Sequence, residues 1–204
     1  KSAQPHLNVV IIDKNFAGFG ASGRNGGWCT GNFAWNQARY ARDSSRAAVL
    51  DMAHHLEGTV TEIIRVCAAH GIDADILPSE EMMIATNPAQ MARLQSEIEH
   101  RHHWGEAHRT RMLTAAEVAQ RMNIPNVLGA MVVTGMARIQ PAKLVRGLAD
   151  VVQSMGVTIY EDTAALSYKK GEITTPRGRV SAPIILRCTE GFTASIKGHR
   201  RDWL

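Results

Sequence analysis

Asn8-Val9-Val10-Ile11-Ile12-Asp13 begins the stretch that decides the fold, and Gly18-Phe19-Gly20-Ala21-Ser22-Gly23-Arg24-Asn25-Gly26-Gly27-Trp28 completes it. An apolar run of this kind is typical of a strand that is covered on both faces. The carboxylate at its end can accept hydrogen bonds from a ribose. Glycines let backbone N–H groups approach a phosphate or a flat ring. The stretch therefore predicts a dinucleotide site.

The composition of the 204 residues narrows the class of protein. Apolar residues make up 45% and charged residues 21%, which is typical of a soluble globular chain. The net charge of +4 is diffuse and aromatic residues are only 5%, so we expect no nucleic-acid partner. No apolar run has the length of a membrane span, and the first residues carry no signal-peptide core, so we expect no membrane partner.

The cysteines indicate a compartment. Cys29, Cys67 and Cys188 lie far apart, which argues against a disulfide framework and against a cysteine zinc site. A reducing cytoplasm is therefore the expected location. The sequence does not give the oligomeric state.

Hydrophobic periodicity and punctuating residues predict the order of helices and strands. We expect a loop over 14–36 and a long helix over 44–70 that ends at Gly71. Pro88 and Pro141 begin two further helices, and Thr114-Ala-Ala-Glu117 is a capping box that begins a short one. Strands are expected at 8–13, 81–85, 128–133, 136–139, 157–160, 164–168, 172–175 and 183–186.

The segment Gly18–Gly23 fits the string G-x-G-x-x-G, but its context does not fit the dinucleotide fingerprint. That fingerprint needs its glycines directly after the strand and a helix directly after them. Here residues 13–17 separate the strand from Gly18, and residues 24–28 are no helix start. Asp13 suits better the acid at the end of the second strand of such a fold. The first strand and its glycine turn would then precede Lys1.

Several segments resemble one family. Asp13 followed by the loop 21–27 resembles the FAD-dependent oxidoreductases of the D-amino-acid oxidase superfamily, in the branch of glycine and sarcosine oxidases and gamma-glutamylputrescine oxidase. Residues 140–148 resemble the helix that returns from the substrate domain in that family, and 156–161 its next strand. Residues 184–193 resemble the strand and turn that close over the cofactor.

The resemblance implies an α/β fold, α+β as a whole: an FAD/NAD(P)-binding Rossmann-like domain with an inserted mixed-sheet substrate domain. The expected division is 1–73 for the first part of the FAD-binding domain, 74–139 for the substrate domain and 140–204 for the second part. The fold would be incomplete, because the opening strand and the family's C-terminal half are absent. The chain is thus expected to be truncated at both ends.

The resemblance also implies roles for particular residues. Asp13 would hold the adenosine ribose, and the backbone of Ala165 would bind adenine. Thr189 and Gly191 would lie near the pyrophosphate and the adenosine half. The pyrophosphate and flavin would lie along Ala21, Ser22, Arg24, Asn25, Gly26 and Gly27. Each also has a plainer interpretation: Asp13, Thr189 and Gly191 as turn residues, and Arg24 as a solvated loop charge.

No residue of this sequence is a compelling general acid or base, and we predict no metal site. His100, His102, His103 and His108 lack the carboxylate or cysteine that would complete a tetrahedral set, and cations at a helix end explain them better. The catalytic residues are therefore left unassigned.

By resemblance, the function is FAD-dependent oxidation of a small amine or amino acid at a CH–NH or CH–NH2 group, with hydride transfer to flavin N5. Two alternatives stay open. One is a non-catalytic fragment or remnant that no longer binds flavin. The other is an NAD(P)-binding module that uses Gly18–Gly23 directly.

Overall fold

The computed structural model describes residues 1–33 and 36–201, and it falls into two compact units. The first unit comprises Lys1–Asn25 and Pro141–Leu204, and the second comprises Gly26–Gln140. The expected first part of the FAD-binding domain, 1–73, contains residues of both units, since the helix α3 (Arg46–His70) lies in the second. The reason is packing, because Val60, Ile63 and Ile64 of α3 contact Cys29 and Ala137 of the second unit's sheet. Which unit binds which ligand stays a prediction.

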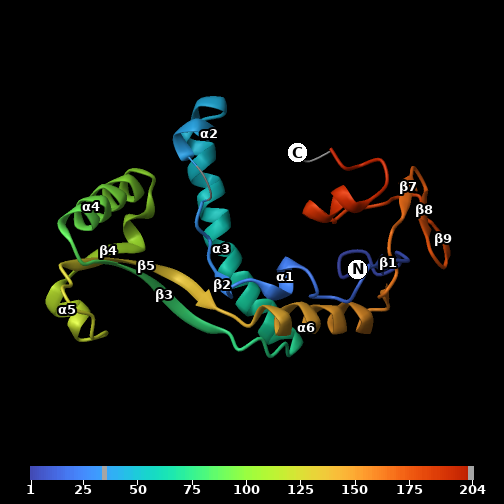
Figure 1. Cartoon of the computed structure of the whole chain (residues 1–204), viewed down its shortest axis with the longest axis horizontal. Coiled ribbons are helices and arrows are strands. Elements are labelled where there is room, and N and C mark those ends of the chain that lie inside the picture. The colour runs from blue at the N-terminus through green and yellow to red at the C-terminus, as the bar shows by residue number, and fades with distance from the viewer. Residues whose placement is uncertain (34–35, 202–204) are drawn as a thin grey trace. The chain divides into compact units, whose positions relative to one another are not determined.

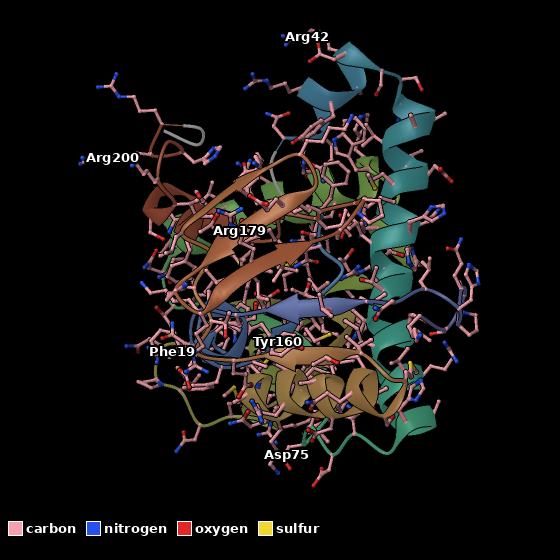
Figure 2. The ribbon with its side chains drawn as sticks, turned by 90° about the vertical axis from the view of Figure 1, so that its right-hand side faces the viewer. Phe19, Arg42, Asp75, Tyr160, Arg179 and Arg200 are labelled. Carbon is pink, nitrogen blue, oxygen red and sulfur yellow. The ribbon has the colours of Figure 1, made fainter. Side chains whose placement is uncertain are left out.

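The first unit is built on two parallel strands. The expected strand at 8–13 is present as β1 (Val10–Ile12), and it pairs with β6 (Thr158–Tyr160). Figure 2 shows the two arrows running in the same direction. Parallel strands need a crossover connection, and α6 (Pro141–Ser154) precedes β6 as the sequence predicts. Val10 and Ile11 are about 40% exposed, which is unusual for strands of this type.

A three-stranded antiparallel sheet completes the first unit. It consists of β7 (Ser167–Lys169), β8 (Glu172–Thr175) and β9 (Gly178–Ser181), and the 3-10 helix η2 (Glu190–Ser195) follows. The predicted strand at 183–186 is wrong. Ile184 and Leu186 are 75% and 81% exposed, and no strand of the described residues pairs with this segment. An extended apolar run forms a strand only where a neighbour supplies backbone hydrogen bonds.

The second unit is a four-stranded antiparallel sheet centred on β5 (Gly129–Arg138) (Figure 1). β5 pairs with β2 (Trp28–Cys29), β3 (Leu77–Ala85) and β4 (Thr110–Thr114). The prediction of two strands at 128–133 and 136–139 is wrong, because they form one strand. Gly135 has φ of 76°, and the register with β3 shifts between Ser79 and Glu81. The glycine therefore marks a bulge, not a turn.

Helices cover both faces of this sheet. α4 (Pro88–His103) packs through Leu94 and Ile98 against one face, and α5 (Ala115–Ala119) packs through Val118 against the other. Figure 1 shows the two helices on opposite sides of the strands. This unit also contains the helix α2 (Gln37–Asp43) and the 3-10 helix η1 (Glu106–His108).

The segment 14–36 holds more structure than the predicted loop. It contains the four-residue helix α1 (Ala21–Arg24) and the strand β2. Residues 34 and 35 lie outside the described part. No helix begins directly after Gly23; α1 begins inside the glycine string and ends at Arg24, with Asn25 as its C-cap.

Candidate functional site

Asp13 is held firmly at the carboxyl end of β1. Its backbone N–H donates to the carbonyl of Tyr160 at 2.9 Å, and its carbonyl accepts from the N–H of Thr163 at 2.8 Å. Its Oδ1 accepts from the N–H of Asn15 at 2.8 Å, which is the turn interaction of the plainer interpretation. Within the described residues, Oδ2 has no hydrogen-bond partner. One oxygen thus serves the turn, and the other remains available at the strand edge where open α/β sheets bind ligands.

Glu161 supports the loop that follows Asp13, a role that the sequence reasoning missed. Its Oε1 accepts from the backbone N–H of Ala17 at 3.0 Å and from Nη1 of Arg146 at 2.7 Å. The Ala17 N–H, and after it the Arg146 guanidinium, hold the pKa of Glu161 below its ordinary value. A signal was present, because Ile12 pairs with Tyr160, so Asp13 and Glu161 follow the two parallel strands at equivalent positions.

The glycines of the string 18–23 close a tight backbone loop. Gly18 has φ of 93°, which favours glycine, and a Cβ at position 23 would overlap the carbonyl oxygen of Gly18. The N–H of Gly23 donates to the carbonyl of Gly20 at 3.2 Å. Gly23 is therefore required by the approach of two backbone segments, whatever the loop binds.

The predicted flavin and pyrophosphate residues of α1 lie on its exposed surface. Ala21, Ser22, Arg24 and Asn25 are all exposed. The Arg24 guanidinium lies 4.4 Å from the centre of the Phe19 ring, and no acidic partner is found for it in the described part. The Asn25 side chain donates to the carbonyls of Ala21 and Ser22 at 3.3 and 3.0 Å. Asn25 thus caps α1, while Arg24 offers a positive charge to an anion.

The two remaining glycines of the loop belong to the second unit. Gly26 is exposed, whereas Gly27 is buried with φ of 77°. The carbonyl of Gly27 accepts from the N–H of Ile139 at 2.9 Å, which extends the pairing of β2 with β5. Gly27 therefore has a structural role in the sheet.

The later candidates lie in two places in the first unit. Thr189 Oγ1 lies 2.7 Å from Oγ1 of the fully buried Thr193, at the start of η2. Gly191 is exposed, and a Cβ there would meet nothing within 4 Å. Its neighbour Phe192 contacts Gly20, since a Cβ on Gly20 would lie 3.3 Å from the ring. The η2 turn and the glycine loop are thus side by side, a contact that the sequence did not predict.

Ala165 stands apart from these residues. It lies in the segment that precedes β7, next to Leu166, whose N–H donates to the carbonyl of Thr174 at 2.9 Å. Among the described residues, no hydrogen bond joins Ala165 to the glycine loop. Its predicted contact with adenine would be a backbone contact, which does not depend on the side chain at this position.

The family profile described as "DAO: FAD dependent oxidoreductase" matches residues 2–201. The chain belongs to the DAO family. It is 27% identical over 192 residues to the gamma-glutamylputrescine oxidoreductase of Escherichia coli K12, covering 90% of this chain and 43% of that protein. The probable oxidoreductase OrdL of Rhizobium meliloti is 27% identical over 210 residues and is covered to 46% of its length. The chain therefore spans a little under half of these relatives.

Solved structures agree on the DAO fold. The glycine oxidase of Geobacillus kaustophilus superposes with a TM-score of 0.68 at 21% identity, over 89% of this chain and 48% of that one. The L-proline dehydrogenase of P. horikoshii superposes with a TM-score of 0.68 at 16% identity, over 97% and 50%. At these identities the likeness concerns the fold, an α/β flavoprotein fold as the sequence predicts.

FAD is the cofactor of the DAO family, and the residues of the first unit fit it. The carboxylate of Asp13 has an available oxygen, Arg24 presents a cation, and the glycine loop keeps side chains away from its backbone.

No helix of the described residues is long and apolar enough to cross a membrane. Nor do three metal-ligating side chains gather anywhere in that part of the chain.

Proposed function

We propose that this chain forms the adenosine side, and part of the substrate side, of an FAD-dependent oxidoreductase that acts on a CH–NH or CH–NH2 group. The substrate would be a small amine or amino acid. The names of the relatives support this class, since they include a gamma-glutamylputrescine oxidoreductase, glycine oxidases and an L-proline dehydrogenase. A cytoplasmic location, favoured by three unpaired cysteines, belongs to the same proposal.

The position of Asp13 carries the proposal. It follows β1 where the parallel partner β6 ends, and its Oδ2 is available to accept from both hydroxyls of a ribose. Ser22, Arg24 and Asn25 would bind the pyrophosphate. Gly26 and Gly27 would extend this binding surface toward the flavin. Thr189 and Gly191 would approach the pyrophosphate, and Ala165 the adenine.

The two compact units would have different roles in binding the cofactor and the substrate. The first, containing β1, α1, α6 and η2, would hold FAD, and the sheet of the second would face the substrate. When bound, FAD supplies the acceptor for the hydride that leaves the carbon next to nitrogen. The chain's own residues bind and orient FAD.

Burial raises the pKa of the Cys29 thiol, as does the nearby Cys67, so Cys29 is a neutral side chain and no nucleophile.

One observation favours the alternative of a fragment that does not retain flavin by itself. A parallel sheet of only two strands, with Val10 and Ile11 about 40% exposed, has little cover for its faces. The NAD(P)-binding alternative has less support, because α1 ends at Arg24 after four residues and presents no long helix to a pyrophosphate.

The test is direct. The purified chain is incubated with FAD, separated from free cofactor by gel filtration and examined by visible absorption. A protein peak with flavin bands supports the proposal. A colourless protein peak together with no measurable FAD affinity would contradict flavin binding by this chain.

A further inference from the structure

The sheet of the second unit carries a cleft of about 460 Å³. Strands β2, β3 and β5 line it, together with Thr30 directly after β2. Met83 and Met136 form an apolar part of its lining, and Met136 is 8% exposed within a cluster that also contains Met131 and Val133. Methionine side chains adapt to the shape of a flexible ligand, so this lining suits an alkyl chain.

An exposed tryptophan stands at one end of the cleft. Trp28 is 73% exposed and pairs directly with Arg138 across β2 and β5. Residues directly opposite each other in an antiparallel pair project to the same face, so the indole and the guanidinium lie together. This end of the cleft thus combines a flat apolar surface with a positive charge.

The other end carries a negative charge. Arg138 pairs with Leu77, which lies four residues from Glu81 on β3, so at about 3.3 Å per residue Glu81 and Arg138 are separated by ~13 Å along the strands. Side chains alternate along a strand, which puts Glu81 on the face of Met83 and its neighbour Glu80 on the opposite face. Glu80 forms an ion pair with Arg121 there.

Neither end of the cleft is neutralised. Among the residues that the structure describes, the side chains of Glu81 and Arg138 have no hydrogen-bond or ion-pair partner. Glu81 is half-buried, which strengthens its attraction for a cation relative to a fully hydrated carboxylate. Two unpaired, opposite charges at the ends of an apolar cleft form a binding pattern for a molecule with the reverse charges.

We propose that this cleft selects an extended zwitterionic amine. The carboxylate of the ligand lies beside Arg138, its alkyl chain lies along Trp28, Met83 and Met136, and its ammonium group lies beside Glu81. The inference rests on the proposed function, because it names the substrate class for the substrate side of that site. It excludes compact amino acids as preferred ligands, since these cannot reach both charges.

The test uses probes of one chain length. Isothermal titration calorimetry at low ionic strength compares 8-aminooctanoate, octanoate and octylamine as ligands of the full chain without added FAD. Each charge pair is partly exposed and contributes up to about 1 kcal/mol, so 8-aminooctanoate should bind about five-fold more tightly than either singly charged probe. Equal affinities for the three probes would overturn the proposal.

Variants assign each charge. Glu81→Gln should abolish the advantage over octanoate, and Arg138→Gln the advantage over octylamine. Glu99→Gln and Arg93→Gln are matched controls on the exposed surface of α4 and should change neither. The charge-swapped double variant Glu81→Arg/Arg138→Glu should regain the preference for 8-aminooctanoate. Failure of both single variants to alter it would overturn the assignment.

The outcome is separable from that of flavin binding. A colourless chain that still prefers 8-aminooctanoate would contradict the proposed function and support the cleft. A chain that binds FAD but treats the three probes alike would support the proposed function and contradict the cleft.

Discussion

At the scale of single residues, the loop after β1 depends on two carboxylates at equivalent strand ends. Asp13 could be predicted from the sequence, because an acid directly after an apolar run is a local pattern. Glu161 could not be predicted in its role, because the partners of its carboxylate, Ala17 and Arg146, come from two other segments. Phe192 was missed for the same reason, since its contact with Gly20 joins segments that are distant in sequence.

Glu161→Gln should loosen the loop and change the response of the protein to acid. Because the folded-state pKa of Glu161 is lowered, its ionised form stabilises the folded chain at pH values above the ordinary glutamate pKa of about 4.3. That contribution is lost as the pH falls through the lowered folded-state pKa. The Tm difference between the native chain and Glu161→Gln should therefore shrink on acidification, and the Ala17 amide should exchange faster in the variant at neutral pH.

The control for this prediction is Glu172→Gln on β8. Glu172 pairs with Lys169 and Arg179, on the sheet whose Arg179 is labelled in Figure 2. Its substitution should leave exchange of the Ala17 amide unchanged. Equal exchange rates in native protein and Glu161→Gln would contradict the role assigned to Glu161.

Gly23→Ala tests the closure of the glycine loop. The added Cβ would overlap the carbonyl of Gly18, so the backbone must shift, and we expect a loss of about 1–3 kcal/mol in the free energy of unfolding. Gly58→Ala in α3, where a Cβ meets nothing within 4 Å, should instead be neutral or stabilising by up to about 1 kcal/mol. Urea denaturation measures both, and equal stabilities of Gly23→Ala and native protein would refute the closure.

At the scale of elements, the helices were predicted better than the strands. α3 and α5 carry local signals, and the structure confirms them: Ser45 caps α3, Gly71 ends it in the left-handed conformation, and Thr114 and Glu117 form the capping box of α5. Strand pairing is decided between distant segments. β4 was therefore missed, and the break expected at Gly135 is a bulge inside a continuous β5.

A buried ion network joins the elements of the second unit. Glu106 of η1 is 6% exposed and accepts from Nη1 of Arg101 at 2.9 Å. Arg109, 5% exposed, lies 3.4 Å from Glu57 of α3 and donates to Asn32 at 2.9 Å. The Nε of Arg109 is 4.0 Å from Glu106 and has no hydrogen-bond partner. The network thus ties η1, α3, α4 and the start of β4 together.

Glu106→Ala should be among the most destabilising substitutions in the second unit. It leaves two largely buried guanidinium groups without this carboxylate, and removing one partner of a buried pair costs about 3–5 kcal/mol. Glu62→Ala is the matched control, because its pair with Arg65 is exposed to solvent on α3 and should contribute little to stability. Thermal unfolding followed by circular dichroism compares them, and a similar small loss for both would contradict the importance of burial.

At the scale of the whole molecule, the family and its cofactor followed from a short run of residues, while the boundaries of the units did not. The sequence cannot reveal that α3 packs on the β2–β5 sheet, since this depends on apolar contacts between residues 29, 60 and 137. β1 is exposed and the segment 183–186 is unpaired for a similar reason. Whether a strand is covered or paired depends on which other strands lie next to it. Their local sequence is that of buried strands.

Asp13→Asn tests the proposed contact of Asp13 with the ribose of FAD. The Asn oxygen can keep the turn hydrogen bond from Asn15, while the amide nitrogen replaces the available acceptor oxygen. Fluorescence titration with FAD should then give a dissociation constant about 10- to 100-fold weaker, with Tm unchanged. Asp150→Ala, on the exposed side of α6, should bind FAD like the native chain. An unchanged FAD affinity for Asp13→Asn would show that Asp13 does not bind the ribose.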